Sequence, residues 1–214
     1  MELKEKLISS FIAFENQISL DNPFVHSMRT EALSSFESKG FPQKKEEAWK
    51  YTSLKKVLKE DFSVFSKTET ALEYKDVQPY FIHDIDSYKI VFVDGKYASN
   101  LSQTTHDGID ICLMSSALEK PKYRSVIENY FNKIADKNSL TSLNTAFVNE
   151  GAYIHITKNK MVEKPIQIIH FSTGNESALL LQPRNLIVVD ENAHVQIIER
   201  HQSLTNNSTL TNCV

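Results

Sequence analysis

Glycine, cysteine and long apolar runs are all scarce in this sequence, and each shortage argues against a class of protein. Only 5 glycines occur in 214 residues, without GxGxxG or GxxxxGK[ST], so nothing supports a nucleotide-binding enzyme. Two cysteines, Cys112 and Cys213, cannot build a disulfide framework and fit a reducing compartment. No apolar run reaches the roughly 18 residues of a transmembrane helix. The first residues also lack a signal peptide's apolar stretch, so we expect a cytoplasmic protein.

An excess of charge of one sign is also missing. Lys and Arg number 24 against 27 Asp and Glu, a formal net charge of −3, which argues against binding nucleic acid by bulk charge. One basic concentration, the 44–59 segment, contains Lys44, Lys45, Lys50, Lys55, Lys56 and Lys59. Trp49 and Tyr51 lie between these lysines and could stack bases. Nearby acidic residues dilute the charge, so a solvated surface anchored by Trp49 is the favoured interpretation and nucleic-acid binding an alternative.

Signatures of catalysis and of metal binding are missing as well. The sequence contains no GxSxG, CxxC, HxxxH or HExxH. Stacked strands could bring together some of the histidines in the C-terminal third, which are His155, His170, His194 and His201. Without a spacing signal, we interpret them as surface or partly buried strand residues. Cys112 is expected to pack as a small hydrophobe, and Cys213 to be an exposed thiol that nothing activates. No catalytic, cofactor-binding or metal residue is assigned.

Helical periodicity dominates the first part of the chain. One helix is predicted by the three- and four-residue spacing of Leu3, Leu7, Ile8, Phe11, Phe14 and Ile18. A second follows Asn22-Pro23 and ends at Gly40. Residues 87–96 predict a hairpin strand that turns at Asp94-Gly95. A further helix is expected over about residues 116–135, with Tyr130 and Ile134 among the residues on its inner face.

After about residue 140 the apolar period changes to two. Short strands are predicted around residues 153–157, 166–171, 179–181, 186–189 and 193–200, with no helical segment between them. A βαβ layout is therefore disfavoured, and a sandwich, a barrel or a parallel β-helix would each satisfy the pattern. We expect two domains, an α+β N-terminal domain over 1–139 and a mainly β region over 140–214. The polar residues from Thr205 to Val214 form no closing element, which suggests a truncated chain.

Three segments carry a resemblance to a known family. The first comprises residues 29–33 (RTEAL), 40–42 (GFP) and 46–54 (EEAWKYTSL). The second is 143–147 (LNTAF), followed by Gly151, Ile154, Ile156, Pro165, Ile166 and Ile168. The third is 183–193 (PRNLIVVDENA), followed by Val195, Ile197, Glu199 and His201. In this order they resemble the SufB/SufD family of iron–sulfur cluster assembly proteins, and E-x-W-K-Y-T favours its SufD branch.

The resemblance carries expectations about fold and function. It implies that the β region is the start of a right-handed parallel β-helix, truncated here. It also implies a non-enzymatic scaffold subunit of the cytoplasmic SufBCD complex, with SufB-like and SufC-like (ATPase) partners. The iron–sulfur cluster would be handled by the complex, and no family site residue carries over to this segment. Trp49 and Tyr51 are expected to pin the N-terminal segment, and Gly151 to permit a bend into the first strand. A stand-alone protein-binding module is the other alternative.

Overall fold

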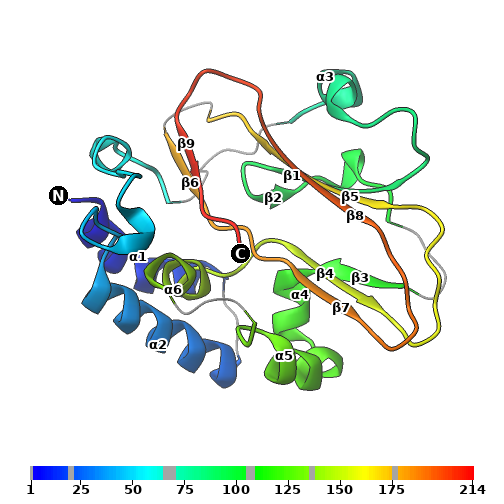
Figure 1. Cartoon of the computed structure of the whole chain (residues 1–214), viewed down its shortest axis with the longest axis horizontal. Helices are drawn as coiled ribbons and strands as arrows, with labels where there is room; N and C mark the ends of the chain where they lie inside the picture. Colours follow the sequence, from blue (N-terminus) through cyan, green and yellow to red (C-terminus); the bar gives the residue numbers. More distant parts are fainter. Residues whose placement is uncertain (1, 19–21, 65–70, 105–108, 135–137, 175–177) are drawn as a thin grey trace.

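Three helices gather on one side of the molecule, and most of the strands lie on the other, accompanied by shorter helices (Figure 1). The computed structural model describes residues 2–18, 22–64, 71–104, 109–134, 138–174 and 178–214. The first two helices, α1 (Leu3–Ile18) and α2 (Pro23–Lys39), are confirmed. The Asn22 side chain caps α2 by accepting from two backbone N–H groups, and Gly40 ends the helix with a φ of 66°. The third member of the group is α6 (Ser139–Ala146), which packs along α2 and was not predicted.

Six strands of the C-terminal third form two successive coils, each made of three strands. The first coil consists of β4 (Ala152–Ile156), β5 (Ile166–Ser172) and β6 (Leu179–Leu181). The second coil consists of β7 (Leu186–Val189), β8 (Ile197–Ser203) and β9 (Thr209–Thr211). Each strand of the first coil pairs in parallel with its counterpart in the second: β4 with β7, β5 with β8 and β6 with β9. The chain therefore crosses three sheets in one order and then crosses them again in the same order.

Earlier strands extend two of these sheets. In the first, β1 (Tyr88–Val93) pairs in parallel with β5 and turns at Asp94-Gly95 into β2 (Lys96–Tyr97), as predicted. In the second, β3 (Ile109–Leu113) runs antiparallel to β4. The sheet orders are β2-β1-β5-β8, β3-β4-β7 and β6-β9. Strands on both sides of the expected boundary at 139/140 thus share hydrogen-bonded sheets, while the division into two domains stays a prediction.

The helix expected over about 116–135 was wrong as a single element. It is broken into α4 (Met114–Glu119), the 3₁₀ turn η5 (Pro121–Tyr123) and α5 (Arg124–Tyr130). Pro121 is the physical reason, because its ring and missing N–H prevent an α-helix from continuing through it. Tyr130 is 47% exposed and Ile134 is 89% exposed, so neither faces inward. The predicted end at Ala135 lies outside the described residues.

Short helical segments complete the described chain. They are η1 (Glu47–Trp49), η2 (Val57–Lys59), α3 (Tyr74–Val77), η3 (Gln78–Tyr80) and η4 (Ser99–Leu101). None of the helices in the described ranges is long and apolar enough to cross a membrane.

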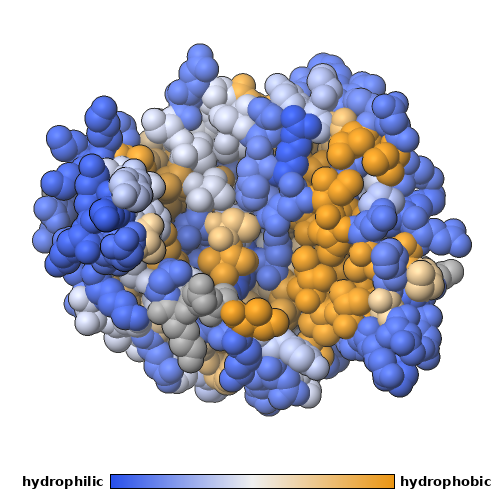
Figure 2. Space-filling view, in the orientation of Figure 1, coloured by the Kyte–Doolittle hydropathy of each residue, from blue (hydrophilic) through white to orange (hydrophobic). Residues whose placement is uncertain are grey.

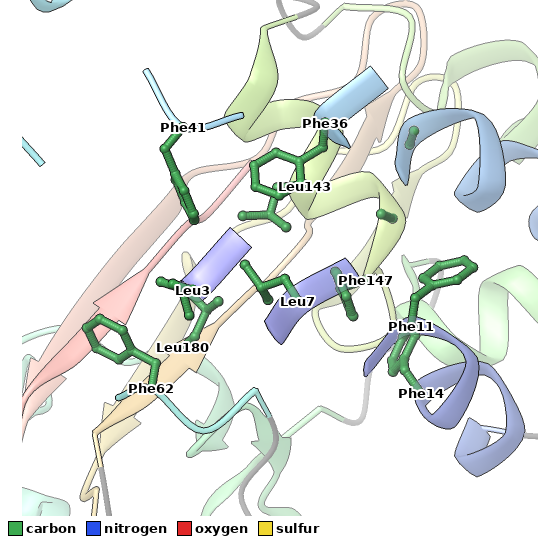
Figure 3. Packing of buried hydrophobic residues seen from close by; sticks show 12 residues of the cluster. Leu3, Leu7, Phe11, Phe14, Phe36, Phe41, Phe62, Leu143, Phe147 and Leu180 are labelled. Atoms are coloured by element: carbon green, nitrogen blue, oxygen red, sulfur yellow. The ribbon is translucent and has the colours of Figure 1, made fainter. Parts of the chain in front are cut away.

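A large aromatic core joins the helices to the coils (Figure 3). Leu7 and Phe11 of α1 face Leu143 of α6 and Phe147 just beyond it, and Leu180 of β6 reaches the same cluster. Phe11 and Phe147 meet edge to face, with ring centroids 5.9 Å apart. Burying this apolar surface therefore fixes α1 and α6 against the first coil.

Candidate functional site

The inner face of β5 and β8 changes character along the strands. Ile166 and Ile168 point into the apolar cluster enclosed by the first coil. Side chains of a strand alternate between its two faces, so His170 follows them on this inner side. In the neighbouring strand Ile197 is opposite Ile166, but Glu199 is opposite Ile168 and His201 is opposite His170. The parallel register thus brings three polar side chains together at one end of an apolar interior.

These three side chains, the His170–Glu199–His201 cluster, are in close contact. The His170 and His201 rings stack 4.7 Å apart with an interplanar angle of 6°, and Phe92 stacks on the other face of His170 at 4.9 Å. His201 Nε2 lies 3.2 Å from Glu199 Oε1, and His170 Nε2 lies 3.5 Å from the same oxygen. The longer distance exceeds that of a good hydrogen bond, and this buried nitrogen has no hydrogen-bond partner among the residues that the structure describes.

Two further groups converge on Glu199. Asn185, just before β7, donates its side-chain amide to Glu199 Oε1 at 3.0 Å. Cys213, just after β9, places its Sγ 3.3 Å from that oxygen. The His170 and His201 rings hold the pKa of Glu199 well below its usual range, so the carboxylate is ionised. Burial and the Glu199 charge raise the pKa of the Cys213 thiol to about 12, so the thiol is protonated.

The other predicted candidates lie elsewhere. His155 lies on β4, and its Nε2 is 3.0 Å from a carboxylate oxygen of Asp190, the residue just after β7. His194 is exposed on the segment before β8. Stacking therefore unites two of the four histidines. Cys112 packs beside the α4–α5 cluster, as expected of a small hydrophobe. In the 44–59 segment Tyr51 is 91% exposed, so the expectation that it pins the segment was wrong.

Comparison with known proteins identifies the family. Residues 1–168 match the model of the SufBD protein N-terminal region, which spans more than half of the chain. The chain belongs to the SufBD family. A SufBD-family iron–sulfur cluster assembly protein of Synechocystis is 27% identical over 169 residues, which are 78% of this chain and 37% of that protein. The Escherichia coli iron–sulfur cluster assembly protein SufD is 24% identical over 170 residues, with the same coverage of each chain.

A third relative matches a shorter stretch. The SufD protein of Bacillus subtilis is 33% identical over 88 residues, which are 40% of this chain and 20% of that protein. The matched part is thus well under half the length of each of these relatives.

The SufBD-like motifs have clear structural roles. Arg29 is buried and donates to the Val148 carbonyl, with its guanidinium 5.2 Å from the Phe14 ring centroid. Burial lowers its pKa to about 10, which leaves it charged at neutral pH. Asn144 of α6 donates to two backbone carbonyls, that of Pro183 before β7 and that of Asn212 after β9. Arg29 thus ties α2 to the segment that leads into the first coil, and Asn144 ties α6 to the second coil. Both have a structural role.

Gly151 and Arg184 form another such contact. Gly151 has a φ of 141°, and a Cβ built on it would lie 1.9 Å from the Arg184 carbonyl oxygen. The close approach lets Arg184 donate its backbone N–H to the Glu150 carbonyl at 2.9 Å. The Arg184 side chain is itself buried against Asn144 and the Phe131 ring. Gly151 therefore opens β4 as expected, and the physical reason is contact between the two coils.

A second polar location lies where the first coil begins. Glu150 lines a hollow together with Phe14, Lys96 and Gln182. Burial raises the pKa of Glu150 to about 7, partly offset by the positive charge of Lys96. Its Oε2 has no hydrogen-bond partner among the described residues. Glu150 is thus a carboxyl group that titrates near neutrality, and no sequence motif marked it.

Proposed function

We propose that this SufBD-family chain is a scaffold component of iron–sulfur cluster assembly, of the SufD type and without catalytic activity of its own. The observation that carries the proposal is the family match over residues 1–168, which includes the helical group, β1 to β4 and the first residues of β5. The relatives that share this region are named iron–sulfur cluster assembly proteins. The E-x-W-K-Y-T run supports the SufD type. A cytoplasmic location follows from the same role.

The fold proposal is that the two coils begin a right-handed parallel β-helix. Three parallel strand pairs, each between strands about 30 residues apart, support it. Connections between parallel strands of one sheet are right-handed in nearly all proteins, which supports the handedness. Apolar side chains gather between β7 and β8 on the face of the second coil that is turned toward the viewer (Figure 2). A third coil or the sheet of a homologous partner would cover this face by the same strand pairing.

The proposed partners are SufB-like and SufC-like subunits. In this scheme the SufC-like ATPase drives the motion, the cluster forms at a junction of the complex, and the SufD-type chain holds its partners in place. Buried hydrogen bonds of Arg29, Asn144 and Arg184 support such a role, because they connect the helices to the coils. A scaffold of this kind transmits force without performing chemistry.

Affinity purification of the tagged chain from its own host tests the proposal. We expect homologues of SufB and SufC to be recovered, and a Gly151→Ala variant that cannot form the coil contact to lose them. Tyr51→Ala, which alters an exposed ring, is the matched control and should retain them. Recovery of unrelated proteins by the folded chain would instead favour a stand-alone binding module. Recovery of nucleic acid that is lost steeply with salt would favour the 44–59 segment as a binding surface.

A further inference from the structure

The strongest unexplained feature is the crowding around one carboxylate oxygen. Glu199 Oε1 lies within 3.5 Å of His170 Nε2, His201 Nε2, Cys213 Sγ and Asn185 Nδ2. A carboxylate oxygen has about two lone pairs, so it cannot accept well from four groups at once. His170 shows the consequence, because its buried Nε2 has no hydrogen-bond partner within the described part of the chain. A protein without another use for these groups would gain by replacing the inner histidine with an apolar residue.

We propose that His170, Glu199 and His201 bind a divalent first-row transition metal ion at the open end of the apolar interior, and that the exposed Cys213 thiol moves in to become a fourth ligand. The three ligand atoms of the His170–Glu199–His201 cluster all lie within 4.8 Å of one another. Bonds of about 2.0–2.3 Å place the ligands of one tetrahedral ion roughly 3–4 Å apart, so small side-chain rotations suffice. Glu199 and His201 are exposed enough to make these rotations, whereas His170 is fixed between Phe92 and His201.

The donor set indicates the class of metal. Two imidazole nitrogens, one carboxylate oxygen and one sulfur suit ions such as Zn²⁺, Fe²⁺ or Co²⁺. Ca²⁺ and Mg²⁺ prefer six or more oxygen ligands, and the cluster has a single carboxylate. Binding would release the thiol proton of Cys213 as the sulfur becomes a thiolate ligand.

The surroundings supply what a metal site needs beyond its ligands. Asn185 donates to Glu199 and holds its carboxylate in place, the usual role of an outer hydrogen bond. Phe92 and the isoleucines of β5 form a dry wall on one side. The ligands come from β5, from β8 and from the residues after β9, so a bound ion would join the first coil to the second. This inference rests on side-chain geometry and is independent of the proposed role in cluster assembly.

Titration of the purified, reduced full chain with Co²⁺ tests the site. We expect one ion per chain, intense visible d–d bands of four-coordinate cobalt and a near-ultraviolet sulfur-to-cobalt band. Zn²⁺ should displace the cobalt and raise the melting temperature. Glu199→Gln and His201→Asn should each weaken binding by at least about tenfold, and Cys213→Ser should remove only the sulfur band and part of the affinity.

Control variants separate the site from general surface binding. His194→Asn removes an exposed histidine of the segment just before β8 and should bind cobalt like the native chain, and Cys112→Ser should retain the sulfur band. Circular dichroism establishes that each variant is folded. The proposal is overturned if the native chain binds no cobalt, or if Glu199→Gln and His201→Asn bind it as tightly as His194→Asn. A failure to recover SufB or SufC homologues would leave this result unaffected.

Discussion

The two coils have the same three-strand layout but differ in what covers them. All seven residues of β5 in the first coil are buried, whereas β8 in the second coil alternates between half-buried and exposed residues. β1 and β3 flank the first coil on one side and the second coil flanks it on the other. Within the described residues, the first coil is the one layer of strands that pairs with the second coil. Burial in this fold is therefore set by the number of stacked neighbours, and composition follows it.

Paired positions of the two coils, which we call rungs, become more polar from the first coil to the second. Moving from β5 to β8, Ile168 is replaced by Glu199 and Phe171 by Gln202. At the rung nearest the start of both strands, Ile166 is opposite Ile197 and both remain apolar. The strand in the first coil (IQIIHFS) is mostly apolar and the strand in the second (IIERHQS) is mostly polar, although both belong to one sheet.

The largest expected effect comes from breaking the contact between the coils at Gly151. Gly151→Ala places a Cβ 1.9 Å from the Arg184 carbonyl oxygen and forces a side chain into a φ of 141°. We expect a loss of about 4 kcal/mol or more in the free energy of unfolding, measured with urea. Gly95→Ala is the control, because its Cβ would lie 3.4 Å from Leu181 and only its φ of 82° is strained. Equal losses in the two variants would show that backbone conformation, not the coil contact, matters.

A matched pair of truncations on one rung measures the difference between the coils directly. Ile166 has no exposed surface, and its neighbour Ile197 is half-buried. Ile166→Ala should cost about 3–4 kcal/mol because it leaves a cavity, and Ile197→Ala about 1–2 kcal/mol because water can fill the space. Urea midpoints of both variants give the comparison. If Ile197→Ala costs as much as Ile166→Ala, the second coil is covered in solution.

The pH dependence of stability tests whether Glu150, just before the first coil, is buried away from water. Its pKa of about 7 in the folded protein lies above the usual value of 4.5, so the folded state favours the protonated form. Its contribution to stability is therefore complete below about pH 4.5 and is lost as the pH rises through about 7. We expect Glu150→Gln to remove this dependence and to be more stable than the native chain at pH 8 by about 1–3 kcal/mol. Parallel stability curves for the two proteins from pH 5 to pH 8 would contradict a buried Glu150.

The sequence predicted the local elements better than the contacts between distant ones. The α1 face, the end of α2 at Gly40 and the Asp94-Gly95 turn were predicted correctly because each depends on neighbours within four residues. Parallel pairing depends on residues about 30 positions apart, so periodicity alone left a sandwich, a barrel and a β-helix open. Pro121 indicated a break in the helix predicted over about 116–135, but the prediction followed the helical spacing of the apolar residues around it.

The His170–Glu199–His201 cluster was missed for a related reason. Metal motifs are sought as ligands a few residues apart, whereas His170 and His201 meet through strand register. Aligning the chain with itself at the offset that pairs Ile166 with Ile197 would have placed one histidine opposite the other. Cys213 and Asn185 could not be added in this way, since both lie outside the paired strands, Asn185 just before β7 and Cys213 after β9.

The smallest expected effect is at Trp49, where the structure reverses an expectation. The residue was expected to anchor the N-terminal segment, but it is partly exposed and belongs to none of the hydrophobic clusters formed by the described residues. Trp49→Ala should therefore change the free energy of unfolding by about 0.5 kcal/mol or less. Phe36→Ala, which removes a fully buried ring from the helical core, should cost about 3–5 kcal/mol under the same conditions. A melting temperature for Trp49→Ala as low as that of Phe36→Ala would restore the anchoring role, and would mean that packing around η1 extends beyond the described residues.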